Sequence, residues 1–218
     1  MNIITQKATV VAPPVPPPPP VFVGTIATVR ATPECMEWDI YAGELADGFD
    51  SVTIDWGDGT VETYPDLDEP WHEYAEPGTY QVKIPDCVKM LQPSFSWEDQ
   101  ADGALALVDL TSNARHLEVL GPYAFAYCRN LTGVDLATVP VRSLGAGVFK
   151  SCTKLVGRLD LPFVNEINCS RDNEPFTDCP GITELHFGAA NEAALKATAA
   201  YYFDPKFGAP NAAVFYDL

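Results

Sequence analysis

The chain has 218 residues, of which 47% are hydrophobic, and a formal net charge of −17 at pH 7. This apolar content suffices for a buried core and argues against a disordered chain. The negative charge is concentrated in residues 1–86, which carry 15 acidic and 3 basic side chains. Such a surface repels a phosphate backbone, so nucleic-acid binding is not expected.

Residues 1–20 are predicted to form a proline-rich tail. The run 13–20 favours an extended polyproline II spacer, with a ligand for an aromatic groove as the alternative. Its prolines break the apolar stretch 8–29, so no membrane span is expected. Residues 1–9 lack the compact apolar stretch of a signal peptide. The chain is therefore exported without a cleaved signal, released by lysis, or given without its leader.

Residues 21–86 show the short alternating segments of a small antiparallel β-sandwich. The alternation of apolar and polar residues predicts strands at 21–29, 36–41, 51–56, 60–64, 71–74 and 79–84. Asp58 and Gly59 are predicted to close a tight turn between two of them, because both residues tolerate positive φ.

Two signatures in this region resemble those of the PKD domain family. Residues 55–60 are Asp-Trp-Gly-Asp-Gly-Thr, and residues 72–82 are His-Glu-Tyr-Ala-Glu-Pro-Gly-Thr-Tyr-Gln-Val. The family has a W/F-G-D-G-T turn followed by an H-x-Y-x-x-P-G-T-Y-x-V segment. The resemblance implies an immunoglobulin-like sandwich over residues 21–86, of the kind used in extracellular proteins as a spacer or adhesion module. It makes Trp56, Gly57, Asp58 and Gly59 the signature turn.

Residues 87–218 contain an internal repeat. A Phe-x-x-Cys-x-x-Leu/Ile block occurs three times, with spacings of 24 and 27 residues. Its members are Phe125, Cys128 and Leu131; Phe149, Cys152 and Leu155; Phe176, Cys179 and Ile182. A short strand-like piece follows each block, at 134–136, 159–161 and 185–187. A repeat of this length predicts stacked coils, each of which buries its apolar side chains only against the next.

These blocks resemble the BspA-type leucine-rich repeats, with their A-F-x-x-C-x-x-L signature, over about residues 105–187. The resemblance implies a right-handed β-solenoid of the kind found on bacterial surface proteins and in gut-associated phage genes. Residues 104–110 are the best candidate for a strand in a first, irregular coil. The alanine-rich segment 191–200 predicts a short helix, and 201–218 is interpreted as a C-terminal cap. The predicted architecture is therefore mainly β, a sandwich followed by a solenoid with a short helix and cap.

The cysteines admit three interpretations. Equivalent positions in stacked coils lie about 5 Å apart, so Cys128, Cys152 and Cys179 are expected to form a buried packing ladder. Zinc is disfavoured because local Cys pairs are missing. Disulfides between Cys35 and Cys87, and between Cys169 and Cys179, are the alternatives.

Candidate catalytic chemistry is sparse. A triad would need His72, His116 or His186 near a nucleophile, and there is no G-x-S-x-G motif. The acidic stretch 55–76 includes 66–69, which offers oxygen ligands for calcium, but it lacks an EF-hand pattern. A solvated loop is favoured, and no cofactor is expected apart from this calcium alternative.

Exposed aromatic residues are the remaining functional signal. The candidates for a binding patch are Phe95, Trp97, Tyr201, Tyr202 and Phe207, and the alternative is that they plug the ends of the solenoid. We expect a non-enzymatic, extracellular binding or scaffold protein on a phage virion (tail or capsid decoration) or a bacterial cell surface. Its expected partners are a surface protein, a glycan, virion subunits or further copies of itself. A bacterial adhesin and an accessory module of a hydrolase are the alternatives.

Overall fold

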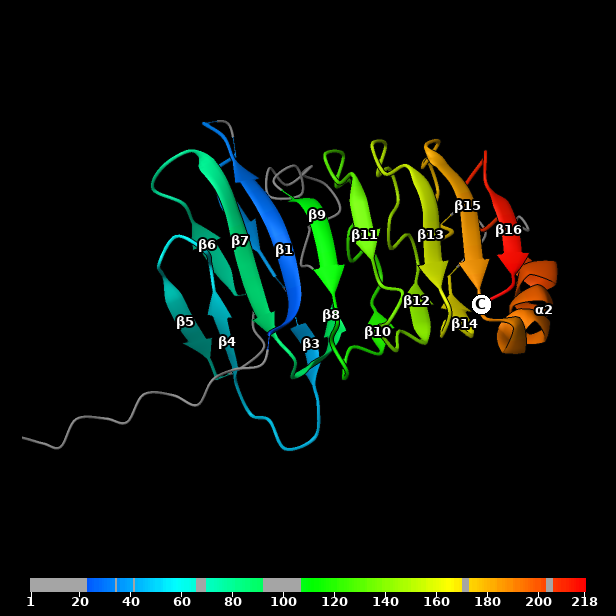
Figure 1. The fold of residues 1–218 in the computed structure, drawn as a ribbon, viewed down its shortest axis with the longest axis horizontal. Helices are drawn as coiled ribbons and strands as arrows, with labels where there is room; N and C mark the ends of the chain where they lie inside the picture. The colour runs from blue at the N-terminus through cyan, green and yellow to red at the C-terminus, as the bar shows by residue number, and fades with distance from the viewer. Residues whose placement is uncertain are drawn as a thin grey trace, which may run out of the picture.

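A computed structural model describes most of the chain beyond the proline-rich tail, and it is mainly β (Figure 1). The described residues are 23–33, 35–40, 42–65, 70–91, 107–169, 173–202 and 206–218. The first eight strands are β1 (Val23–Ala31), β2 (Glu37–Asp39), β3 (Ala42–Leu45), β4 (Val52–Asp55), β5 (Val61–Tyr64), β6 (Trp71–Glu73), β7 (Gly78–Pro85) and β8 (Val88–Leu91). The others are β9 (Leu107–Ser112), β10 (Val119–Leu120), β11 (Gly133–Asp135), β12 (Ser143–Gly145), β13 (Gly157–Leu161), β14 (Glu166–Asn168), β15 (Ile182–Phe187) and β16 (Ala213–Tyr216).

The second half of the chain has a β-solenoid-like arrangement. On one side β8, β10, β12 and β14 pair in parallel. On the other side β9 pairs with β11, β13 pairs with β15, and β15 pairs with β16, again in parallel. Figure 1 shows the two rows of strands following one another along the long axis of the molecule. A 3-10 turn, η1 (Ala189–Asn191), leads into helix α2 (Glu192–Tyr202), which confirms the predicted C-terminal helix.

The N-terminal half shares both of its larger sheets with the solenoid. One sheet has the order β11-β9-β1-β7-β4-β5, with β1 antiparallel to both β7 and β9. The other has the order β14-β12-β10-β8-β3, with β3 antiparallel to β8. The expected boundary between residues 86 and 87 falls in the tight turn that joins β7 to β8. The sheets therefore cross this boundary, and the N-terminal strands cover the first coil of the solenoid, whose edges would otherwise be unpaired.

Asp86 lies in the turn between β7 and β8 and stabilises the junction between the two halves of the chain. Its side chain is only 2% exposed, and its carboxylate accepts hydrogen bonds from the backbone N–H of Arg115 at 2.6 Å and from the Arg115 Nε at 2.7 Å. The His116 backbone N–H donates to it at 3.3 Å. Gly24 lies directly beside it, where a Cβ atom would meet the Asp86 Cα at 2.8 Å. A buried carboxylate is tolerated here because its oxygens are satisfied by N–H donors.

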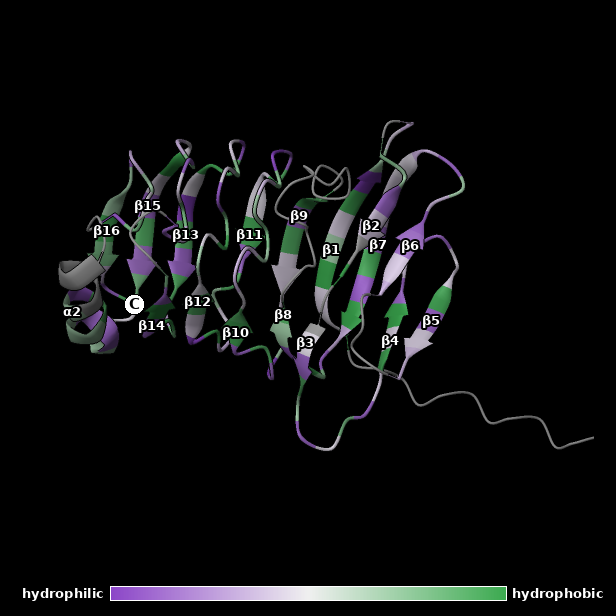
Figure 2. Cartoon of the chain, turned by 180° about the vertical axis from the view of Figure 1, so that it is seen from behind, coloured by the Kyte–Doolittle hydropathy of each residue, from purple (hydrophilic) through white to green (hydrophobic). Residues whose placement is uncertain are grey.

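One hydrophobic core runs through both halves. Apolar and polar residues alternate along the long strands, which Figure 2 shows as changes of colour on β1, β7 and β15. In β15, Leu185 and Phe187 are fully buried, whereas Glu184 keeps partial exposure. The same period of two was the basis for predicting most of the strands.

The sequence did not predict β3, β8, β10, β12, β14 or β16. Each has two to four residues, too few for a clear alternation. Each also lies beside a strand distant in the sequence, as β3 does beside β8, so long-range pairing rather than local pattern decides its conformation.

Candidate functional site

The signature turn between β4 and β5 is built by two aspartates and two glycines. Asp55 Oδ1 accepts a hydrogen bond from the Gly57 N–H at 3.0 Å, and Asp58 Oδ1 accepts one from the Thr60 N–H at 2.9 Å. Gly57 has a φ of +85° and its backbone lies so close to Gln81 that a Cβ would meet the Gln81 carbonyl oxygen at 2.6 Å. Only glycine fits both constraints.

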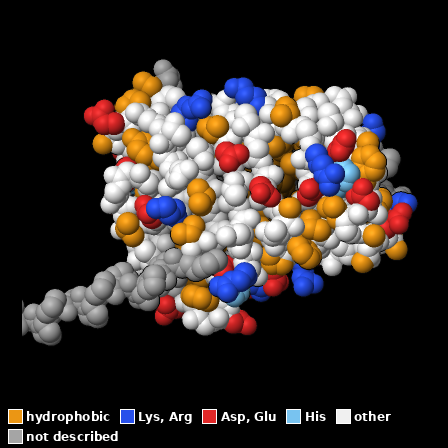
Figure 3. Space-filling model, viewed as in Figure 1, with side chains coloured by type: hydrophobic (Ala, Val, Ile, Leu, Met, Phe, Trp, Pro, Cys, Tyr) orange, Lys and Arg blue, Asp and Glu red, His pale blue; other side chains and the backbone are white. Residues whose placement is uncertain are grey.

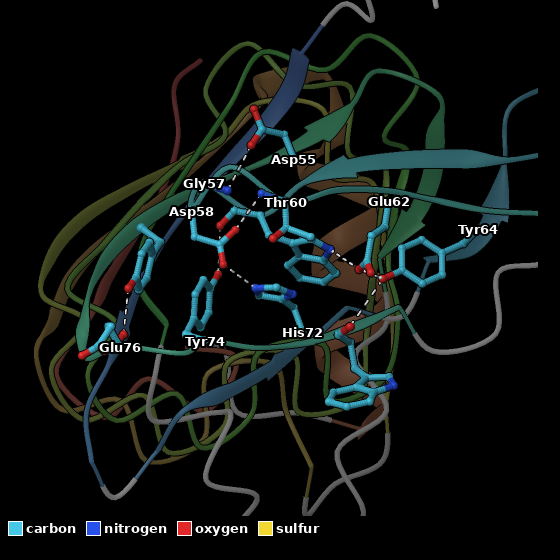
Figure 4. Close-up of polar contacts among 12 residues, drawn as sticks. Asp55, Gly57, Asp58, Thr60, Glu62, Tyr64, His72, Tyr74 and Glu76 are labelled. Carbon is cyan, nitrogen blue, oxygen red and sulfur yellow. Dashed lines mark hydrogen bonds and ion pairs between the residues drawn. The ribbon is translucent and has the colours of Figure 1, made fainter. Parts of the chain in front are cut away.

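His72 ties this turn to β6 (Figure 4). Its Nε2 lies 2.8 Å from Asp58 Oδ2, and its ring stacks on the buried Trp56 with centroids 5.1 Å apart. The Tyr74 hydroxyl donates to the Trp56 carbonyl at 3.1 Å, and the Trp56 Nε1 donates to Glu62 Oε2 at 2.9 Å. These contacts give His72 and Asp58 a role in holding the sheets together, and no Ser or Cys side chain takes part in them.

The two aspartates of the turn are stabilised as carboxylates. The hydrogen bond from Lys83 at 2.7 Å lowers the pKa of Asp55. Burial acts to raise the pKa of Asp58, but the Thr60 N–H and His72 outweigh it and the pKa is lowered. Among the described residues, no group of three or more His, Cys, Asp or Glu side chains is placed to hold a metal ion. The calcium alternative at 66–69 falls outside the described residues.

The repeat residues form a continuous buried column. The ring centroids of Phe125 and Phe149 lie 5.3 Å apart, and those of Phe149 and Phe176 lie 5.7 Å apart, with nearly parallel planes. The Cys152 Sγ donates to the Phe125 carbonyl at 3.0 Å, and the Cys179 Sγ donates to that of Phe149 at 2.9 Å. The third residue of each block is fully buried as well: Leu131, Leu155 and Ile182. The Cys152 and Cys179 thiols thus bind the backbone of the preceding coil, and the repeat residues serve packing.

None of the six cysteines takes part in a disulfide. The two disulfides considered as alternatives, between Cys35 and Cys87 and between Cys169 and Cys179, are therefore not formed in this structure. Burial raises the pKa of the Cys87 thiol to about 11 and that of Cys169 to about 12. Burial also raises the pKa of Cys152 well above its usual value. Thiols in this state are poor nucleophiles near neutral pH.

The aromatic candidates do not form a described patch. Phe207 is fully buried and packs edge-on against Phe187, with centroids 5.4 Å apart, so it plugs the end of the solenoid and is not part of a binding surface. Tyr201 and Tyr202 belong to the last turn of α2, but their side chains are not among those described. Phe95 and Trp97 lie outside the described residues.

A broad outward face is formed instead by β9, β11, β13, β15 and β16. The strand register places Asp160, His186 and Phe215 in one row across β13, β15 and β16. In the adjacent row on the same face, Arg158 lies beside Glu184. Figure 3 shows acidic, basic and apolar side chains gathered over this part of the molecule. On the neighbouring strands, Thr111 and Asp135 are exposed on the same face. Such alternating charged and aromatic groups on an outward strand face are suited to contact a partner.

The densest polar contacts of this face surround His186. Its Nδ1 lies 2.7 Å from Asp217 Oδ1 and its Nε2 lies 3.0 Å from Glu184 Oε2. The exposed ring of Phe215 stacks on the imidazole, with centroids 4.5 Å apart. From the sequence, His186 is a candidate only for a catalytic triad. The spacing of Glu184 and His186 by two residues is a signal for a shared strand face, but Asp217 follows β16, which the sequence did not predict.

Comparison of the chain with protein-family models, with curated proteins and with solved structures gave no match. The resemblances to PKD domains and to BspA-type repeats therefore rest on the quoted residues. Within the described part of the chain, no helix has the length and apolar character needed to span a membrane.

Proposed function

We propose that the protein is a non-enzymatic binding or scaffold protein that contacts its partner through the face formed by β9, β11, β13, β15 and β16. The observation that carries this proposal is the contrast between the two sides of these strands. Inward side chains such as Leu185 and Phe187 are fully buried in a continuous core. Outward side chains such as Arg158 and Asp135 are exposed over successive coils. A solenoid built in this way offers a wide, rigid surface whose chemistry changes from coil to coil.

The finer assignment of the fold is part of the proposal. We take residues 21–86 to be a PKD-like, immunoglobulin-like sandwich and residues 87–218 to be BspA-type leucine-rich repeats with a cap. The contacts of Trp56 and His72 support the first, since they explain why the signature turn and the later His-x-Tyr segment occur together. The stack of Phe125, Phe149 and Phe176 supports the second.

The proposed setting is extracellular, on a phage virion or a bacterial cell surface. The partner in that setting is a surface protein, a glycan or a neighbouring virion subunit. A secreted bacterial adhesin would use the same face. The two settings differ in where the chain accumulates, so immunogold labelling of purified particles and of cell envelopes from a producing culture distinguishes them.

Binding is tested with the purified chain on a glycan array and on intact cells and particles. The variant Asp135→Lys changes an exposed residue of the proposed face, on β11. Glu166→Lys makes a comparable charge reversal at an exposed residue of β14, in the other sheet, and serves as the matched control. We expect Asp135→Lys to weaken binding and Glu166→Lys to leave it unchanged. Equal loss in both variants, or no binding to any of these surfaces, contradicts the proposal.

A further inference from the structure

The His186 imidazole is enclosed although it lies on the outward side of β15. Its side chain is only 5% exposed, because Phe215 of β16 stacks over the ring. Charged groups reach it from every neighbouring segment. Arg158 comes from β13 and is paired with Asp160 at 2.6 Å; Glu184 comes from β15 itself, and Asp217 comes from the segment after β16.

Both ring nitrogens face carboxylate oxygens. The separations are 2.7 Å from Nδ1 to Asp217 and 3.0 Å from Nε2 to Glu184, which are hydrogen-bond distances. A neutral imidazole carries one N–H and one bare lone pair, so one of these contacts would then set a lone pair against a carboxylate oxygen. The doubly protonated ring donates to both. The geometry therefore favours the imidazolium, since this form donates to both carboxylates.

The balance of charges supports this state. Burial of the ring acts against the charged form, and Arg158 adds a nearby positive charge, but the hydrogen bonds to Asp217 and Glu184 outweigh both and raise the pKa of His186. The ordinary histidine value is about 6.5. The imidazolium thus persists to a higher pH here than in an unfolded chain.

We infer that His186, with Glu184 and Asp217, is a pH-dependent latch that fastens the C-terminal end of the solenoid. Strand β16 is the outermost strand of its sheet, and within the described part of the chain β15 is its only strand partner. The latch adds a charged bridge between β15 and Asp217, next to the bond from the Leu218 N–H to the Phe187 carbonyl at 3.2 Å.

The direction of the pH effect follows from linkage. Because the folded pKa of His186 is raised, the latch contributes its full stability below the unfolded value of about 6.5 and loses it as the pH rises through the folded value. When the ring loses a proton, one of its two carboxylate contacts becomes repulsive. We therefore expect β16 to loosen at high pH while the inner coils stay closed.

The test is an NMR titration of ¹⁵N-histidine-labelled protein together with hydrogen exchange corrected for intrinsic rates. The ¹⁵N shifts of His186 should report an imidazolium below its midpoint, and this midpoint should lie above the ordinary histidine value. The protection of the β16 amides should fall as the pH passes this midpoint. The protection of the β10 and β12 amides should not follow it.

Two variants isolate the charge of the latch. Asp217→Asn keeps an oxygen that accepts from Nδ1 but removes the negative charge, so the His186 midpoint and the loss of β16 protection should both shift to lower pH. Asp135→Asn is the matched control: it lies on the same face, and its new amide oxygen still accepts from the Ala137 N–H. This control should change neither the His186 midpoint nor the pH at which β16 loses protection. A neutral His186 tautomer below pH 6.5, or β16 protection that is indifferent to the His186 midpoint, overturns the latch.

Discussion

The N-terminal strands and the solenoid coils share sheets and core, yet they are stabilised in different ways. Around Trp56, each contact occurs once: His72 stacks on the ring, and Tyr74 and Glu62 satisfy its polar atoms. Around Phe149 the same contacts recur in each coil. A substitution in the N-terminal half should therefore destabilise the fold by leaving polar groups unsatisfied, whereas a substitution in the solenoid should do so by removing buried volume.

The largest effect is expected in the middle of the phenylalanine column. Phe149 is fully buried between two other rings, so Phe149→Ala should lower the free energy of unfolding by about 3–5 kcal/mol. Urea denaturation followed by circular dichroism measures the loss. Phe163→Ala is the control, since Phe163 is 46% exposed, and it should change stability by less than about 0.5 kcal/mol. Similar losses in the two variants would contradict a solenoid held by its column.

The second-largest effect is expected at the junction between the two regions. Asp86→Ala leaves the backbone N–H groups of Arg115 and His116 without their acceptor, which should cost about 2–3 kcal/mol. Because both sheets cross the junction, the chain should still unfold in a single transition. Two separate transitions, with only one of them shifted by Asp86→Ala, would show instead that the two regions fold independently.

The stability contributed by the Asp86 carboxylate should depend on pH in a definite direction. Burial acts to raise the pKa of Asp86, but the hydrogen bonds from Arg115 and His116 outweigh it and the pKa is lowered. The carboxylate therefore stabilises the fold above the unfolded value of about 3.9 and loses this contribution as the pH falls through the lower folded value. The difference in unfolding free energy between the native chain and Asp86→Ala should accordingly become smaller in acid. A difference that does not change with pH would contradict a stabilising role of the Asp86 carboxylate.

The same contrast explains how far the sequence could predict the structure. The turn at Asp58 and the repeated Phe-x-x-Cys blocks are local patterns, so the sequence predicts the strands that flank the turn and the strands that follow the blocks. The pairing of β1 with β9 joins segments about 80 residues apart along the chain, and no local pattern encodes it. His186 was visible, but Asp217 reaches it only because β16 pairs with β15. Sites that depend on the register of short strands therefore escaped prediction.

A smaller loss of stability is expected when a single buried hydrogen bond of the N-terminal half is removed. The buried Tyr74 hydroxyl donates to the Trp56 carbonyl, so Tyr74→Phe leaves a buried acceptor unpaired and should cost about 1–2 kcal/mol. Tyr80→Phe removes an exposed hydrogen bond to the Glu76 carbonyl, where water can replace the hydroxyl, and should cost less than about 0.5 kcal/mol. Thermal and urea denaturation of both variants compare the two values, and a larger loss for Tyr80→Phe would refute this explanation.

The smallest effect should be a gain in stability, and it tests the repeat itself. Tyr127, Ser151 and Asp178 occupy the same position of the three blocks and share a φ near +60°, a conformation that costs a side-chain-bearing residue about 1 kcal/mol. Ser151→Gly removes this strain and keeps the bond from the residue 151 N–H to the Thr177 carbonyl. Since glycine also loses more entropy on folding, the net gain should be about 0.5 kcal/mol. Thr153→Gly, at a nearby exposed position that is not left-handed, should lower stability instead. If both glycines destabilise the chain equally, the left-handed residue is not a strained point of the coil, and the turn is set by the bonds between coils alone.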